Sequence, residues 1–295
     1  MQTIEALKRK IDSVTDLESV VKTMKAMASV RIKQYEKAVL SLRAFSRTID
    51  MAMQVVVSHP LPPLAEDRKT RDGHVGAVVF GSDQGMAGQL NDVVLNHTLK
   101  HLRQSLPPET GNMRFIAVGA RMKRKLERVG HPVDAYIRVP GSVAGITSHV
   151  QDILSVIDEW ERRWSPRRIW LYYSIKPEKT GFLPHAERLL PIDQQWVEEL
   201  KKKEWPSRCL PMITMDTTAM FSSLIKQHLF TAIYKAFAES MASENQSRLQ
   251  SMQQAEKNIQ EELDDLSMEY HRRRQMAITG ELLDIVSGFE ALETT

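Results

Sequence analysis

Glycine and proline are missing from both ends of this 295-residue chain. Residues 1–59 and 212–279 contain neither, whereas all 13 prolines and 11 of the 13 glycines lie between Pro60 and Pro211. Because these two residues interrupt helices, their distribution predicts one long helix at each end and a compact region between them. The expected division is an N-terminal helix at 1–59, a central domain at 60–211 and a C-terminal helix at 212–295.

Other scarcities exclude whole classes of protein. A single cysteine, Cys209, excludes an intrachain disulfide and any CxxC motif. No run approaches the roughly 20 apolar residues that span a bilayer, and the N-terminus MQTIEALKRKIDSV has no apolar core of a signal peptide. The net charge of +3 gives little reason to expect nucleic acid as the partner. We expect a cytosolic protein, or one held at a membrane only through its partners.

Both terminal segments carry apolar residues at steps of three and four, the pattern of one helix face. The first series begins Ile4, Leu7, Ile11, Val14, and the second begins Met252, Ala255, Ile259, Leu263. About 55 residues at 1.5 Å each make a helix of roughly 80 Å, far longer than an ordinary globular helix. The simplest way to bury both stripes is an antiparallel coiled coil, which we favour over separate helical bundles.

The middle of the chain alternates between strand-like and helix-like segments, which predicts an α/β fold with a mostly parallel sheet. The expected strands are 74–80, 113–119, 133–139 and 167–175, and the expected helices are 91–106, 120–130 and 149–164.

A glycine-rich loop, FGSDQGMAGQLND at 80–92, follows the first expected strand. Strand, glycine turn and helix is how many phosphate sites are built. Here Ser82 and Asp83 stand where a P-loop needs lysine and Ser/Thr, so a negative charge lies where phosphate would bind. We therefore predict that the loop binds no nucleotide, and that Ser82 or Asp83 caps backbone N–H groups at a tight turn. The sequence has no HExxH and no GxSxG motif either, so we expect no metal, cofactor or catalytic residue.

The two ends also resemble a known family. The stretches 242–252, ASENQSRLQSM, and 270–292, YHRRRQMAITGELLDIVSGFEAL, resemble the C-terminal helix of the γ subunit of F-type ATP synthases, which ends in a pattern close to YNxxRQxxITxELxEIVSGAxA. The N-terminal LKRKIDSVTDLESVVKTMKAMASVRIKQ is similar to that family's IKxRIxSVxxTxKITKAMxMVAxxK, and the loop GSDQGMAGQLN to its SDRGLxGGxN. The matches run in order along nearly the whole chain.

The resemblance implies a long antiparallel coiled coil with a central Rossmann-like α/β domain. It implies a non-catalytic rotor shaft inside a ring of α and β subunits, with the ε subunit and the membrane c-ring as further partners. Arg274 and Gln275 are expected to hydrogen-bond a loop of β, and Met24, Arg248 and Thr279 to couple the shaft to a lever of β. The residues expected to form an apolar tip turning in a sleeve are Ile278, Leu282, Ile285 and Val286.

Some positions depart from the family pattern. His271 replaces asparagine, Phe289 replaces alanine and Gln84 replaces the usual arginine, while residues 213–216 lack the family's Tyr-Glu-Pro-Asp. These changes indicate a diverged branch. Two other hypotheses stay open on the sequence: a nucleotide-binding α/β enzyme with helical arms, and a free coiled-coil scaffold or nucleic-acid-binding arm. Arg274 could also be a solvated charge, and Met24 plain coiled-coil core.

Overall fold

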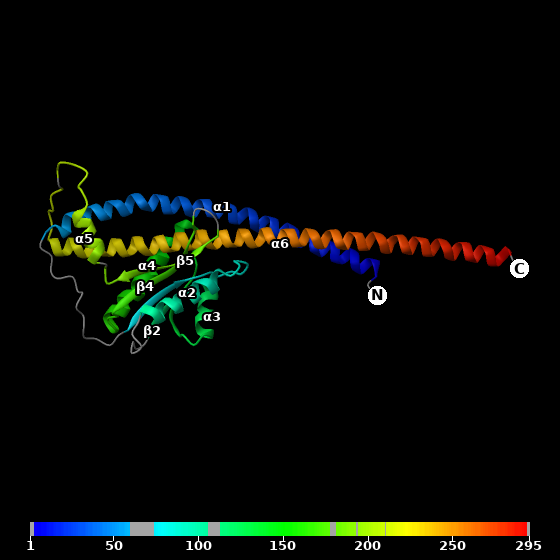
Figure 1. Ribbon diagram of the computed structural model, residues 1–295, viewed down its shortest axis with the longest axis horizontal. Coiled ribbons are helices and arrows are strands. Elements are labelled where there is room, and N and C mark those ends of the chain that lie inside the picture. Colours follow the sequence, from blue (N-terminus) through cyan, green and yellow to red (C-terminus); the bar gives the residue numbers. More distant parts are fainter. Residues whose placement is uncertain are drawn as a thin grey trace. The chain divides into compact units, whose positions relative to one another are not determined.

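Two long helices dominate the computed structural model, which describes residues 3–59, 74–105, 113–177, 181–192, 194–209 and 211–293. Helix α1 spans Ile4–Val57 and helix α6 spans Thr217–Glu293 (Figure 1). Side-chain oxygens meet the free N–H groups at both helix starts, because Thr3 accepts from Ala6 and Asp216 accepts from Ala219. The helices predicted from the missing glycine and proline are confirmed.

A five-stranded sheet forms the centre of the chain, in the order β3-β2-β1-β4-β5. The neighbours β3, β2, β1 and β4 run parallel, and β5 pairs antiparallel with β4. The bounds are β1 Val75–Phe80, β2 Met113–Val118, β3 Val133–Ile137, β4 Arg168–Ile175 and β5 Leu183–Leu190. The four predicted strands are confirmed. Edge strand β5 was missed because LPHAERLL is too polar to show a strand pattern.

Helices cover both faces of the sheet. The helices that follow β1 and β2, α2 Leu90–Ser105 and α3 Ala120–Arg128, pack on one face through the core of Val94, Leu102, Met122 and Leu126. Helix α4, Ile146–Arg163, preceded by the short turn η1 at Val143–Gly145, packs on the other face together with α6. All six residues of β1 are buried, as expected for a central parallel strand covered on both sides.

By packing, the chain divides into two compact units, residues 1–27 with 249–295, and residues 28–248. In the second unit the inner part of α1 lies beside α6, and Tyr35 shares a core with the sheet. Nearby, Met53 and Val57 pack on the otherwise unpredicted helix α5, Gln194–Lys202. This division follows the proximity of backbone segments in space, whereas the expected division at 59 and 211 follows the helix ends.

The first unit is an antiparallel helix pair. Leu7, Val14 and Leu266 form its buried apolar centre. Lys10 pairs with Glu262 at 2.9 Å and Lys25 with Glu256 at 2.5 Å, so residue numbers rise along one helix as they fall along the other. The predicted antiparallel coiled coil is therefore confirmed. Within the described residues, no helix carries an apolar stretch that is long and uncharged enough for a membrane span.

Candidate functional site: a filled crevice and an exposed helical tip

Open α/β sheets bind ligands outside the carboxyl ends of their strands, where the strand order reverses. In this sheet the chain moves from β1 outward to β2 and β3, and then returns to place β4 on the other side of β1. The reversal therefore lies between β1 and β4, and the glycine-rich loop after β1 stands at its mouth. We call the space outside the carboxyl ends of these two strands the switch-point crevice.

Asp83 holds this loop to the neighbouring turns. Its carboxylate accepts hydrogen bonds from the backbone N–H of Ala120 at 2.7 Å and of Val139 at 2.9 Å, and from the hydroxyl of Tyr136 at 3.0 Å. The prediction that Asp83 accepts from backbone N–H groups is confirmed, but the predicted place is wrong, because these donors lie at the start of α3 and after β3 and not at the turn into α2. Burial, followed by the bond to Asp83, raises the pKa of Tyr136.

The rest of the loop is also tied to its own surroundings. The Ser82 N–H donates to Oδ1 of Asn91 at 2.9 Å, and the Asn91 amide donates to the Ser82 hydroxyl at 2.8 Å. Gly119, with a φ of +99°, approaches so closely that a Cβ added there would lie 2.8 Å from the Ser82 carbonyl group. The Ser82 N–H and the Asn91 amide therefore donate within the fold.

Helix α6 itself fills the switch-point crevice. The Ser247 hydroxyl donates to the carbonyl of Ala87 in the loop after β1, at 2.7 Å. One turn earlier, the Ser243 hydroxyl donates to the carbonyl of Ser174 near the end of β4, at 3.1 Å. Phe237 packs edge-on against Phe80, with ring centroids 4.9 Å apart. Side chains of α6 therefore occupy the place where open α/β sheets commonly bind a ligand.

A small polar pocket remains beside this helix. Its volume is about 140 Å³, below the roughly 300–1,000 Å³ of ordinary ligand pockets. Glu244 and Arg248 form a buried ion pair in its wall, at 2.5 Å. The Arg248 Nε has no hydrogen-bond partner among the described residues. Burial raises the pKa of Glu244, while Arg248 opposes that rise.

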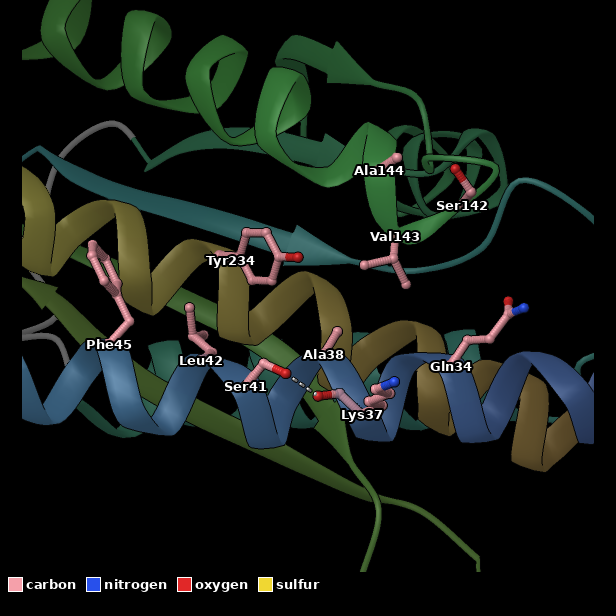
Figure 2. Close-up of a pocket in the computed structure, with 10 residues that line it drawn as sticks. All are labelled: Gln34, Lys37, Ala38, Ser41, Leu42, Phe45, Ser142, Val143, Ala144 and Tyr234. Carbon is pink, nitrogen blue, oxygen red and sulfur yellow. Dashed lines mark hydrogen bonds between the residues drawn. The ribbon is translucent and has the colours of Figure 1, made fainter.

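A larger groove of about 620 Å³ lies between α1, η1 and α6 (Figure 2). Apolar side chains line most of it, including Leu42, Phe45, Val143 and Tyr234. The polar side chains drawn there are Gln34, Lys37, Ser41 and Ser142, and Ser41 donates to a carbonyl of its own helix. Among the described residues that line the groove, no carboxylate and no histidine is present.

The predicted partner-binding residues fall into two groups by burial. Seven of them lie exposed near the C-terminal end of α6, namely Arg274, Gln275, Ile278, Thr279, Leu282, Ile285 and Val286. Met24 is half-buried, whereas Arg248 is only 5% exposed. The structure brings the seven onto one helical segment, residues 274–286, which we call the α6 tip. It does not present Arg248 at the surface.

The α6 tip carries large apolar side chains that are not buried. Tyr270 is the last α6 residue in the described apolar cluster with α1. Beyond it, Ile278 is 52% exposed and Ile285 is 72% exposed. An isolated helix is marginal in water, and a row of exposed large apolar side chains is typical of a surface that another protein covers.

Sequence reasoning missed the residues that attach α6 to the sheet. Ser243 and Ser247 look like ordinary small polar residues, although the many alanines and serines of 236–247 could have signalled close packing. His97 and His101, four residues apart on α2, were also passed over. Their rings are 6.3 Å apart, and burial lowers the pKa of both. In the described part of the chain no group of three potential metal ligands exists.

The fold and the site together define a class of protein built on two long helices, in which one helix occupies the crevice of an α/β domain. Comparison with family models gives a match to ATP synthase over residues 3–292. The chain belongs to this family.

Curated relatives along the full chain carry the name ATP synthase gamma chain. The protein from Pelotomaculum thermopropionicum is 27% identical over 99% of this chain and 100% of its own length. The protein from Nostoc punctiforme is 26% identical with the same coverage.

Among solved structures, a chain of the Euglena gracilis mitochondrial ATP synthase, OSCP/F1/c-ring assembly matches with a TM-score of 0.64 and 17% identity, covering 98% of this chain and 94% of that chain. A chain of the rotor of the same enzyme matches with a TM-score of 0.61 and 16% identity, covering 93% of this chain and 98% of that chain. At such identity the likeness concerns the fold.

Proposed function

We propose that this chain is the central rotor shaft of an F-type ATP synthase, turning inside a ring of α and β subunits and carrying no catalytic site of its own. The observation that carries the proposal is the α6 tip, an apolar helical segment that is exposed in the isolated chain. Relatives named ATP synthase gamma chain support it along their whole length. The ε subunit and the membrane c-ring complete the expected set of partners.

The mechanism follows from symmetry. Three identical β sites face one asymmetric shaft, so the shaft meets each of them differently at any moment. Turning it changes which β subunit is pressed and which is released. Inverting a two-state site from 1:99 to 99:1 takes about 5.5 kcal/mol of differential interaction. A shaft that supplies this needs stiff helices and a small number of strong contacts.

The predicted partner-binding residues would have different roles in the contact with β. Arg274 and Gln275 would hydrogen-bond a loop of β, and the apolar residues Ile278, Leu282, Ile285 and Val286 would turn in an apolar sleeve. Met24 and Thr279 would form the coupling set with Arg248. Since Arg248 is buried against Glu244, its contribution would pass through the position of α6 and not through direct contact with β.

The chain would lie on the cytoplasmic face of a bacterial inner membrane, held there by its partner subunits.

Copurification tests the proposed shaft function directly. The full chain, coexpressed with α and β subunits of the same source, should form a complex with them and stimulate their ATPase activity. A chain that neither joins the ring nor changes its ATPase rate would refute the shaft function.

Substitution of Met24 separates coupling from assembly. Met24→Lys places a cation near an acidic lever of β at some rotor angles only, so we expect ATP hydrolysis to persist while ion pumping weakens. Met24→Leu keeps the volume and the apolar character and should preserve both activities. Loss of the whole complex in Met24→Lys would assign Met24 to the coiled-coil core instead.

A further inference from the structure

The segment of α6 that fills the switch-point crevice is fixed to the sheet at two points. Ser243 and Ser247 are buried, at 0% and 4% exposure. Their hydroxyls donate to backbone carbonyls on opposite sides of the crevice, Ser174 on β4 and Ala87 after β1. Because the two serines are four residues apart, they lie on the same face of the helix.

These hydroxyls had a local alternative. A serine in a helix commonly donates to the carbonyl four residues earlier. On the same helix, Ser222 and Ser223 do so, donating to Thr218 and Ala219. Ser243 and Ser247 instead bond to carbonyls 69 and 160 residues away in the sequence. They therefore join two parts of the molecule that the backbone of α6 alone would not hold together.

The packing around the two bonds is apolar. Ala238 and Ala242, with Phe237 and Met241, belong to the same buried core as the strands. Apolar contact is non-directional, so it restricts the rotational setting of the helix less strictly than a hydrogen bond does. Hydrogen bonds require a defined distance and angle. Two of them, one turn apart on α6 and directed to β4 and to the loop after β1, fix the rotational setting of α6 against the sheet.

We propose that Ser243 and Ser247 are positioning residues that lock the α/β domain to α6 against twist, so that torque passes between them without slippage. The inference rests on the proposed shaft function and adds a role for the crevice. Open α/β sheets commonly bind a ligand in this crevice. Here α6 lies in it instead, and the crevice serves as the torsional joint between the shaft and the α/β domain.

The test measures torsional stiffness in the assembled complex. A bead is attached to the α/β domain through Arg124→Cys on α3, in a Cys209→Ser background, and its angular fluctuations are recorded while the ring is held in one catalytic state. In Ser243→Ala/Ser247→Ala we expect the angular variance to rise by about twofold, since two net stabilising bonds are lost. With the bead attached instead at the native Cys209, the variance should not change.

A matched control uses the other serine pair. Ser222→Ala/Ser223→Ala removes two exposed hydroxyls of the same helix that bond only within it, and should leave the variance unchanged at both attachment points. An unchanged variance in the Ser243/Ser247 variant, or an equal rise at both attachment points, would overturn the joint.

A crosslink between the same two positions tests the idea in a second way. In Ala87→Cys/Ser247→Cys, again with Cys209→Ser, oxidation with diamide should link the two positions almost completely in the isolated chain. The oxidised complex should rotate and hydrolyse ATP at the rate of the reduced complex, because a locked joint does not move during turnover. Rotation that stops on oxidation and returns on reduction would show that α6 moves on the sheet, and would refute the proposal.

The two proposals can fail separately. If the unmodified chain does not join an α/β ring, the shaft function fails whatever the crosslink shows. If the chain assembles and stimulates ATPase, but the stiffness or crosslink result is contrary, the shaft function stands and only the joint is overturned.

Discussion

Two stretches of the same helix, α6, behave in opposite ways. Residues 237–248 are almost entirely buried and bond to the sheet, whereas the α6 tip at 274–286 is largely exposed along its apolar side chains. Both are continuous helix without proline. The difference therefore comes from what covers each stretch and not from helix propensity. The buried stretch finds its partner inside the chain, and we infer that the tip finds its partner in other subunits.

The largest expected difference in stability between the two stretches of α6 is at Phe237. Phe237→Ala should lower the free energy of unfolding by about 3–5 kcal/mol, because the ring is buried against Phe80 and its removal leaves a cavity. Ile285→Ala on the exposed tip should change it by less than about 0.5 kcal/mol. Urea unfolding of both variants measures the contrast, and similar losses at the two positions would show that the tip is buried in the isolated chain.

The next largest loss of stability is expected at the buried ion pair of Glu244 and Arg248. Arg248→Ala should cost about 3 kcal/mol at neutral pH, because it leaves the Glu244 carboxylate unpaired and buried. The double variant Arg248→Met/Glu244→Leu should recover most of this loss, since it removes both charges while keeping apolar volume. Thermal unfolding of the single and double variants distinguishes an unpaired charge from simple loss of packing.

The Arg248→Ala variant should also be pH-dependent. Burial raises the pKa of Glu244, and removing Arg248 removes an interaction that lowers it. A carboxyl whose folded-state pKa is above its unfolded value binds more protons when folded, so stability falls as the pH rises from the unfolded pKa of about 4.3 through the folded pKa. Relative to the native chain, the variant should regain stability as the pH falls toward 5. A deficit independent of pH would contradict the charge explanation.

Removal of the Asp83 carboxylate should lower the free energy of unfolding by less than removal of Arg248. Asp83→Ala removes a helix cap and two further bonds, so we expect a loss near the upper end of about 0.5–2 kcal/mol. Tyr136→Phe removes only one of these bonds and serves as the graded control. Calorimetric titration of the full chain with Mg-ATP should show no binding before or after the change. Micromolar binding that disappears in Asp83→Ala would instead support a nucleotide site.

Deletion of residues 276–295 should have the least effect on stability and a large effect on function. The tip makes few described contacts within the chain, so hydrogen exchange in residues 113–177 should match that of the full chain. Coupled ATP synthesis by the assembled complex should fall. Loss of protection throughout the sheet on deletion would assign the tip to the fold.

Much of this architecture could be predicted from local pattern. The strand at 75–80 is a continuous apolar run between turn residues, and the helices follow a spacing of three and four. The prediction that the loop at Asp83 binds no nucleotide came from the absence of the lysine that a P-loop requires. Strand β5 could not be predicted, because Pro184, His185 and Glu187 lie at a sheet edge whose polar side chains resemble a loop. The burial of Arg248 was equally hidden, since an arginine within a long helix is ordinarily solvated.

The sequence by itself determined the two terminal helices, the four parallel strands and the helices between them, because glycine, proline and apolar spacing act on neighbouring residues. Only the tertiary structure decided that α6 fills the switch-point crevice. The bond from Ser247 to Ala87 joins residues 160 positions apart, and contacts of that kind leave no periodic trace in the sequence. They form when the packing of the sheet places two carbonyls within reach of two hydroxyls on one helix face.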